Sequence, residues 1–231
     1  MMDINIREHI DLELKNLEEK LLKLGKLAID AVSQSVLALK EQDVDKAKAV
    51  IEGDKNLDDM AEDIDMSCLK FMARFQPLGQ DLRTVSAIMH MAVDLERIGD
   101  YGASIAKRAI KLSDRPHIKP LLDIPRIESD IRKMVFLALD ALMEKDTKKA
   151  EDVCRMDDEV DDLERQIFRE LLLIMIERPQ VIQQATELLL VARTLERAGD
   201  HATNLAERVI YIVTGKKISA SQIRRPREEN S

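Results

Sequence analysis

Apolar residues recur at helical spacing along almost the whole chain, in six segments separated by short polar breaks. Residues three and four positions apart share one face of an α-helix, so this pattern predicts amphipathic helices that each bury one stripe. The segments are longer than ordinary globular helices and fit bundles with short antiparallel connections. They cover about residues 5–40, 43–75, 80–113, 125–144, 147–177 and 180–214.

The breaks between these segments carry residues that begin or end helices. Asp43 and Asp146 stand where an N-cap is expected, because an aspartate side chain accepts a hydrogen bond from a free backbone N–H of the first turn. Pro77 and Pro179 mark the next break in each half, since proline lacks the N–H and clashes inside a helix. The proline-rich stretch 114–125 is the predicted linker between the two halves.

The chain contains an internal duplication. Residues 95–100 read LERIGD and residues 195–200 read LERAGD, at an offset of 100 positions; EQDVDKA at 41–47 parallels EKDTKKA at 144–150 at an offset of 103. Three helical segments precede the linker and three follow it. The sequence therefore predicts an all-α fold of six long helices in two tandem, duplicated three-helix bundles, related by a pseudo-twofold.

The predicted domains are residues 1–113 for the first bundle and residues 125–214 for the second, followed by a flexible basic tail at 215–231. The tail is rich in lysine and arginine and contains Ser, Gln and Pro, a composition typical of disorder. It is either a solubilising end or a contact to an acidic partner or membrane surface.

Composition narrows the function. The net charge is −8 and aromatic residues make up 3% of the chain, with no tryptophan. Such a protein repels phosphate backbones and lacks stacking platforms, so we expect no nucleic acid partner. The beginning of the chain lacks the basic and apolar regions of a signal peptide, and the longest apolar run, 171–176, is too short to span a membrane. Cys68 and Cys154 lack metal or redox spacing, and we expect reduced core thiols in a cytoplasmic protein.

In each half, two carboxylates of the third helix lie on or beside its apolar stripe rather than opposite it. At about 100° per residue, Glu96 and Asp100 fall about 20° and 60° from the centre of the apolar stripe, and Glu196 and Asp200 repeat the arrangement. The middle helices add aspartates at the edge of their own stripes, paired at i, i+4 so that both side chains point from one face. These are Asp54, Asp58, Asp157 and Asp161.

Like charges gathered from two adjacent helices repel strongly unless they are compensated. A multivalent cation is one solution, because carboxylate oxygens are suitable ligands for hard cations. Ion pairs with nearby arginines are a second, and exposure to water at the edge of the bundle is a third. The candidate arginines are Arg97, Arg108, Arg197 and Arg208.

These motifs carry a family resemblance. The pair LERIGD and LERAGD, together with DKNLDD at 54–59 and DDEVDD at 157–162, resembles the repeated acidic signatures of the PhoU family, and the likeness runs from about residue 8 to 215. The resemblance implies two three-helix bundles and a cytoplasmic negative regulator of phosphate uptake and of the phosphate-starvation response. It implies contacts with the phosphate ABC transporter ATPase and with a sensor histidine kinase, a homodimer, and at most peripheral membrane association through the transporter.

The resemblance also implies a metal site. Some members of the family bind multinuclear iron or zinc through the acidic signatures. In this sequence the matching ligands are Asp54, Asp58, Glu96, Asp100, Asp157, Asp161, Glu196 and Asp200. Tyr101 corresponds to His201 in the second half, so the two sites need not bind equally. His201 is either an ion-paired or surface histidine or a further ligand.

Two other functions are weighed against that of a phosphate regulator. A helical adaptor or chaperone-type scaffold without a phosphate role needs no acidic residues on an apolar stripe, which argues against it. A di-iron enzyme of the ferritin-like kind needs Glu-x-x-His motifs, and none occurs here. The chain also lacks Gly-rich phosphate loops and hydrolase motifs, so we expect neither enzymatic activity nor direct binding of inorganic phosphate.

Overall fold

The computed structural model describes residues 2–224, and the side chains of residues 6–224. Six long α-helices account for most of this part of the chain, and their bounds agree with the predicted segments to within a few residues. A single 3-10 turn, η1 (Pro179–Val181), and a short last helix, α7 (Ala220–Ile223), complete it. The long helices are α1 (Met2–Glu41), α2 (Val44–Phe75), α3 (Gly79–Leu112), α4 (Asp123–Glu144), α5 (Thr147–Glu177) and α6 (Ile182–Thr214).

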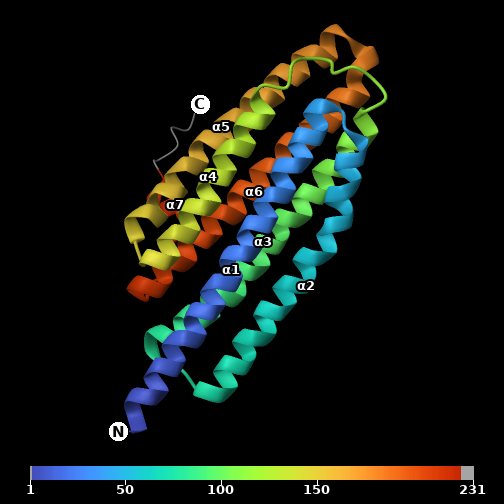
Figure 1. Ribbon diagram of the computed structural model, residues 1–231. Coiled ribbons are helices and arrows are strands. Elements are labelled where there is room, and N and C mark those ends of the chain that lie inside the picture. Colours follow the sequence, from blue (N-terminus) through green and yellow to red (C-terminus); the bar gives the residue numbers. More distant parts are fainter. Residues whose placement is uncertain (1, 225–231) are drawn as a thin grey trace.

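The helices form two three-helix bundles that lie side by side (Figure 1). Helices α1, α2 and α3 pack on one another, and α4, α5 and α6 do the same. Between the bundles, α3 packs on α6 and α1 packs on α4. Each of these pairs joins a helix to its own counterpart in the duplication, as a pseudo-twofold relation requires. The predicted fold of two duplicated three-helix bundles is confirmed.

The second helix of each bundle begins at the predicted cap. The Asp43 carboxylate accepts a hydrogen bond from the backbone N–H of Lys46 at 2.9 Å. The Asp146 carboxylate accepts from Lys148 at 2.8 Å and from Lys149 at 3.3 Å. These bonds satisfy N–H groups that have no partner within the helix.

The linker ends earlier than predicted. Helix α4 already begins at Asp123, so Pro125, predicted to close the linker, lies in the first turn of the helix. Proline is tolerated there because its missing N–H would have no intrahelical partner in any case. Side chains hold the backbone between α3 and α4: Gln42 donates to the Leu112 carbonyl at 3.0 Å, Gln184 donates to the Pro116 carbonyl at 3.2 Å, and Arg178 donates to the Ile118 carbonyl at 3.0 Å.

Helices α1 and α3 approach each other closely at Gly102. A Cβ atom at this position would lie 2.8 Å from the carbonyl carbon of Ala31 and 2.9 Å from the backbone nitrogen of Val32. Only a residue without a side chain fits between the two backbones. This contact sets the spacing of the first bundle and thus the position of α3, which carries Glu96 and Asp100.

The beginning of the predicted flexible tail is folded. Gly215 ends α6 in the left-handed conformation, at φ 71°. The chain then turns back so that Ala220 is buried and α7 packs against α5 and α6. The sequence predicts flexibility for all of 215–231, and for 215–224 this prediction is wrong. Ile218, Ala220 and Ile223 pack against the apolar core, a contact that composition alone does not reveal. Residues 225–231 lie outside the described part of the chain.

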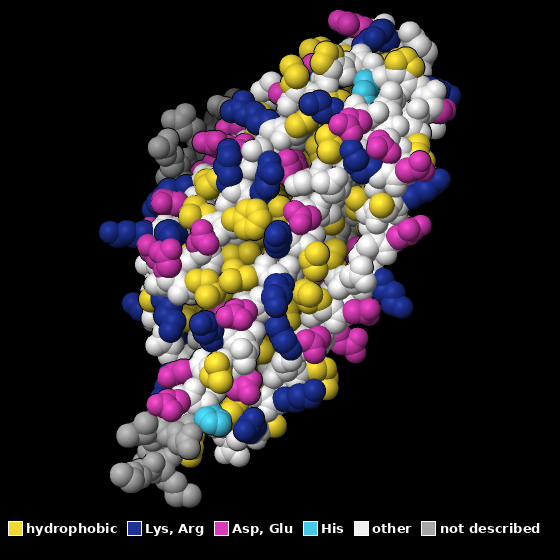
Figure 2. Space-filling model, in the orientation of Figure 1, with side chains coloured by type: hydrophobic (Ala, Val, Ile, Leu, Met, Phe, Trp, Pro, Cys, Tyr) yellow, Lys and Arg dark blue, Asp and Glu magenta, His cyan; other side chains and the backbone are white. Residues whose placement is uncertain are grey.

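The surface is mixed in charge. Figure 2 shows acidic and basic side chains interspersed over the visible face, with apolar side chains between them. Both cysteines are free and buried, as predicted. Burial raises the pKa of the Cys68 and Cys154 thiols to about 12, so both are inert at neutral pH. Among the described helices, none combines the length and the apolar character that crossing a membrane requires.

Candidate functional site

The predicted carboxylates of the first half converge between α2 and α3. One oxygen each from Asp58, Glu96 and Asp100 lies within 4.8 Å of the other two. Asp58 is exposed, whereas Glu96 and Asp100 are half-buried at 23% and 33% side-chain exposure. Asp54, one turn before Asp58, is also half-buried. We call these four residues the first acidic cluster.

The charges of this cluster are only partly compensated. The Arg97 guanidinium lies 3.0 Å from Oδ2 of Asp100 and 3.6 Å from Oε2 of Glu96, but it is more than half exposed and its ion pairs are therefore weak. Burial, followed by the neighbouring Asp100 charge, raises the pKa of Glu96 and of Asp54 above their usual values. The cluster thus favours a bound proton or another positive charge.

The donor set fits a divalent cation. Three oxygens bound to one tetrahedral zinc ion at about 2.0–2.2 Å lie about 3.3–3.6 Å apart, so oxygens within 4.8 Å of one another reach this geometry by side-chain shifts of less than about 1 Å. Carboxylates suit Mg²⁺, Ca²⁺ and Mn²⁺ best, and they also bind zinc and iron. Asp58, Glu96 and Asp100 could hold such an ion, with Asp54 one turn away.

In the second half, the equivalent aspartates pair with an arginine from the end of the described chain. Asp157 and Asp161 on α5 face an arginine, Arg224, which follows α7. One guanidinium nitrogen contacts Oδ2 of Asp157, and the other lies 3.7 Å from Oδ2 of Asp161. Glu196 on α6 is half-buried and Asp200 is exposed. We call Asp157, Asp161, Glu196 and Asp200 the second acidic cluster.

Asp157 is the most buried member of either cluster. Its side chain is 1% exposed, and it reaches α6 beside Gly199, where a Cβ would lie 3.0 Å from its Oδ1. Burial raises the pKa of Asp157 to about 7 although the Arg224 charge lowers it, and Asp161, Asp200 and Glu196 raise it further. Its Oδ2 contacts Arg224 as an ion pair without good hydrogen-bond geometry.

His201 belongs to the contact between the bundles. Its Nδ1 lies 2.8 Å from Oδ1 of Asp94, and its Nε2 lies 3.3 Å from the hydroxyl of Tyr101. Asn204 donates to the same Asp94 oxygen at 3.1 Å. The structure thus pairs His201 with Asp94 of the other bundle.

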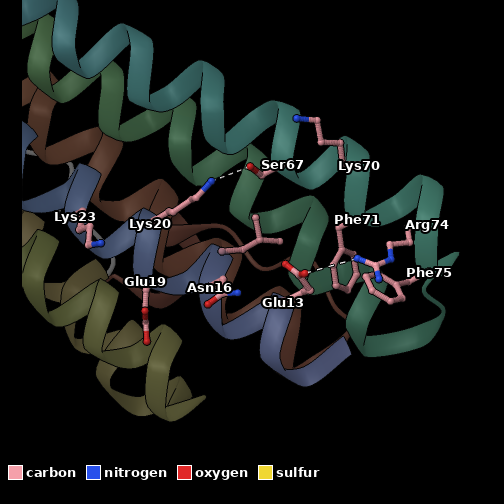
Figure 3. A pocket seen from close by; sticks show the side chains of 11 residues that line it. Glu13, Asn16, Glu19, Lys20, Lys23, Ser67, Lys70, Phe71, Arg74 and Phe75 are labelled. Carbon is pink, nitrogen blue, oxygen red and sulfur yellow. Dashed lines mark hydrogen bonds and ion pairs between the residues drawn. The ribbon is translucent and has the colours of Figure 1, made fainter. Parts of the chain in front are cut away.

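A separate groove runs between α1 and α2, about 20 Å along α2 from the first acidic cluster (Figure 3). Its volume is about 470 Å³. Lys20 donates to Ser67 at 3.0 Å and pairs with Asp63, and Arg74 pairs with Glu13 at 3.8 Å. Lys20 and Arg74 thus already have partners within the chain, while two further lysines, Lys23 and Lys70, also line the groove.

The sequence singled out all eight carboxylates of the two clusters, but it did not reveal two residues that the structure brings into play: Arg224 at the second acidic cluster and Asp94 beside His201. Arg224 was assigned to a flexible tail, and its only signal was the coexistence of an arginine-rich end with an acidic cluster in one chain. Asp94 was not singled out, because a single aspartate carries no motif. Of the four candidate arginines, Arg97 pairs within the first acidic cluster, whereas Arg108 pairs instead with Glu187 at 2.6 Å.

Comparison with known proteins gives a consistent result. The PhoU domain model matches residues 21–109 and 124–209. The chain is 35% identical over 213 residues to the phosphate-specific transport system accessory protein PhoU homolog of Clostridium acetobutylicum, covering 92% of this chain and 97% of the relative. It is 36% identical over 226 residues to the homolog of the same name from Pseudomonas aeruginosa, covering 97% and 93%. The crystal structure of PhoU from Pseudomonas aeruginosa superposes with a TM-score of 0.85 at 37% identity, covering 89% of this chain and 99% of that one.

Proposed function

This chain belongs to the PhoU family, and we propose that it is an accessory protein of phosphate-specific transport that regulates uptake negatively. The observation that carries the proposal is the family match in both halves, combined with relatives of that name aligned over nearly their full length. The protein acts by contact rather than by catalysis. Its partners are the ATPase of the phosphate ABC transporter and a sensor histidine kinase, and it works in the cytoplasm as a homodimer.

Within this function, the acidic clusters hold iron or zinc. Support comes from three convergent oxygens in the first acidic cluster and from carboxylates whose pKa values are raised by burial and mutual repulsion. A bound cation supplies the missing positive charge and links α2 to α3. Because these helices form one wall of the bundle, metal occupancy can alter the surface that a partner meets.

The regulatory role is tested in a strain that lacks the gene. We expect phosphate uptake and transcripts of phosphate-starvation genes to rise in phosphate-rich medium, and the wild-type chain to restore repression. Affinity capture with the purified protein should recover the transporter ATPase or the sensor kinase. Normal uptake and transcript levels in the deletion strain would rule out negative regulation.

The metal role is tested by elemental analysis of untagged protein. We expect stoichiometric iron or zinc in the wild type and its loss in a variant carrying Glu96→Gln, Asp100→Asn, Glu196→Gln and Asp200→Asn. A metal-free wild type that is folded and still regulates would leave the clusters as ion-pairing or partner-binding residues. Light scattering at several concentrations tests the homodimer.

The alternative is a helical adaptor or chaperone-type scaffold without a phosphate role. It would be favoured by capture of a chaperone in place of the transporter ATPase and by unchanged phosphate uptake in the deletion strain.

A further inference from the structure

The second acidic cluster differs from the first in the arginine that lies on it: Arg224 is largely buried and comes from the segment after α6, whereas Arg97 at the first cluster is more than half exposed. Arg224 pairs with Asp157 and lies near Asp161, with the arginine side chain 16% exposed and that of Asp157 1% exposed. A carboxylate so deeply buried needs a positive charge beside it. The guanidinium therefore fills the role that a metal ion would have at this cluster.

The arginine is delivered by a docked segment, residues 215–224. Gly215 turns the chain after α6, and the N–H of Ala220 donates to Oε1 of Glu207 at 2.5 Å. Ile218 and Ile223 pack on the apolar core on either side of Ala220. These contacts bring Arg224 to the cluster as part of the fold. A group tethered over so few residues acts at an effective concentration on the order of millimolar.

Chain topology explains why only one cluster is covered. The segment that follows α6 is free to fold back over its own bundle. The corresponding segment after α3 is the linker to α4, which Gln42 and Gln184 hold through the carbonyls of Leu112 and Pro116. The duplication therefore produced two similar acidic clusters, but only the second is followed by a segment that can return to it.

We propose that residues 215–224 are a built-in counter-ion for the second acidic cluster, and that Arg224 and a divalent cation compete for Asp157 and Asp161. Cation binding at this cluster releases the segment, whereas the first acidic cluster takes its cation without this competition. The competition rests on the cation-binding role that the proposed function gives to the clusters. The docking of Arg224 on Asp157 does not depend on that role. The competition lowers the apparent cation affinity of the second cluster by the fraction of molecules in which the segment is undocked.

Docking is tested without metal, by hydrogen–deuterium exchange of peptides covering 216–224 in the presence of a chelator. The wild type is compared with Arg224→Gln and with Lys217→Gln, a matched control that removes the same charge from an exposed position of the same segment. We expect exchange to rise about fivefold or more in Arg224→Gln only, because its docking contact is lost. Equal exchange in the wild type and Arg224→Gln would overturn the proposal.

Competition is tested by calorimetric titration with Mn²⁺ in a Glu96→Gln, Asp100→Asn background, where the heat comes from the second cluster. We expect Arg224→Gln to raise the Mn²⁺ affinity about tenfold and Lys217→Gln to leave it unchanged. We also expect saturating Mn²⁺ to bring exchange of the wild-type segment to the Arg224→Gln rate. Equal affinities, or no binding at this cluster in any variant, would overturn the competition.

The two proposals fail in different ways. Absence of Mn²⁺ binding in the chain with both clusters intact would count against the cation role under the proposed function. Normal repression of phosphate uptake by Arg224→Gln, alongside a clear change in Mn²⁺ affinity, would support the competition and show that repression does not depend on it.

Discussion

The hydroxyl of Tyr101 lies 3.3 Å from Nε2 of His201, and the two residues occupy equivalent positions of the duplicated sequence. Their rings, 5.6 Å apart between centroids, meet where α3 packs on α6. The pseudo-twofold thus passes close to this pair. If the neutral imidazole donates from Nδ1 to Asp94, its Nε2 accepts from the Tyr101 hydroxyl, so one histidine links both bundles.

Removal of this link should weaken the protein. We expect His201→Ala to lower the free energy of unfolding by about 1–3 kcal/mol, since buried Asp94 loses one of its two hydrogen-bond partners and keeps only Asn204. Urea unfolding followed by circular dichroism measures the change, and His90→Ala, at an exposed position of α3, is the control. Indistinguishable midpoints for the two variants would contradict the assigned role of His201.

Two glycines should respond to alanine in opposite directions. At Gly102 the new Cβ meets the backbone of Ala31 and Val32 at 2.8 and 2.9 Å, so the helices must move apart and we expect a loss of about 1–3 kcal/mol. At Gly53 nothing lies within 4 Å of the new Cβ, and alanine at this helical position should stabilise by about 0.5–1 kcal/mol. Thermal unfolding of both variants checks the prediction, and a stabilised Gly102→Ala would show that the close approach of α1 and α3 is wrong.

The two aspartate caps should contribute similar amounts in separate bundles. We expect Asp43→Ala and Asp146→Ala each to cost about 1 kcal/mol, because backbone N–H groups of α2 and α5 lose their acceptors. The double variant should show the sum, since the sites share no contact. Asp45→Ala, at a 98% exposed side chain in the first turn of α2, is the control. A cap variant no less stable than this control would argue against the observed capping bonds.

The metal-free protein should lose stability as the pH rises through neutrality. Burial raises the pKa of Asp157 to about 7 in the folded state, above its ordinary value of 3.8. Protonation therefore favours the folded state: the stabilising contribution is fully present below about pH 4 and is lost as the pH rises through about 7. The pKa of Glu196 is raised in the same direction, by burial and then by Asp200.

This dependence is measured by urea unfolding at pH 5 to 8 with a chelator present. Asp157→Asn removes the titrating group while keeping its size, so we expect it to resemble the wild type at pH 5 and to lose less stability by pH 8. The exposed Asp59→Asn on α2 is the control and should follow the wild-type curve. Parallel curves for Asp157→Asn and the wild type would be inconsistent with a buried, titrating Asp157.

Much of the fold follows from local signals in the sequence. Helix periodicity, the caps at Asp43 and Asp146 and the breaks at Pro77 and Pro179 act within a few residues, and the observed helices begin and end close to these signals. The position of Pro125 was misjudged because a proline ends a helix in the interior but is accommodated in a first turn. The eight carboxylates were found because duplication repeats their spacing.

The sequence alone determined the six helices, the division into two halves and the face of each helix that carries the carboxylates, because these depend on the geometry of a single helix. Only the tertiary structure decided which charges meet. The pairings of Arg224 with Asp157 and of Asp94 with His201 join residues 67 and 107 positions apart. The physical reason is that such contacts depend on how helices pack and where the chain turns back, and neither can be derived from the periodicity of any one segment.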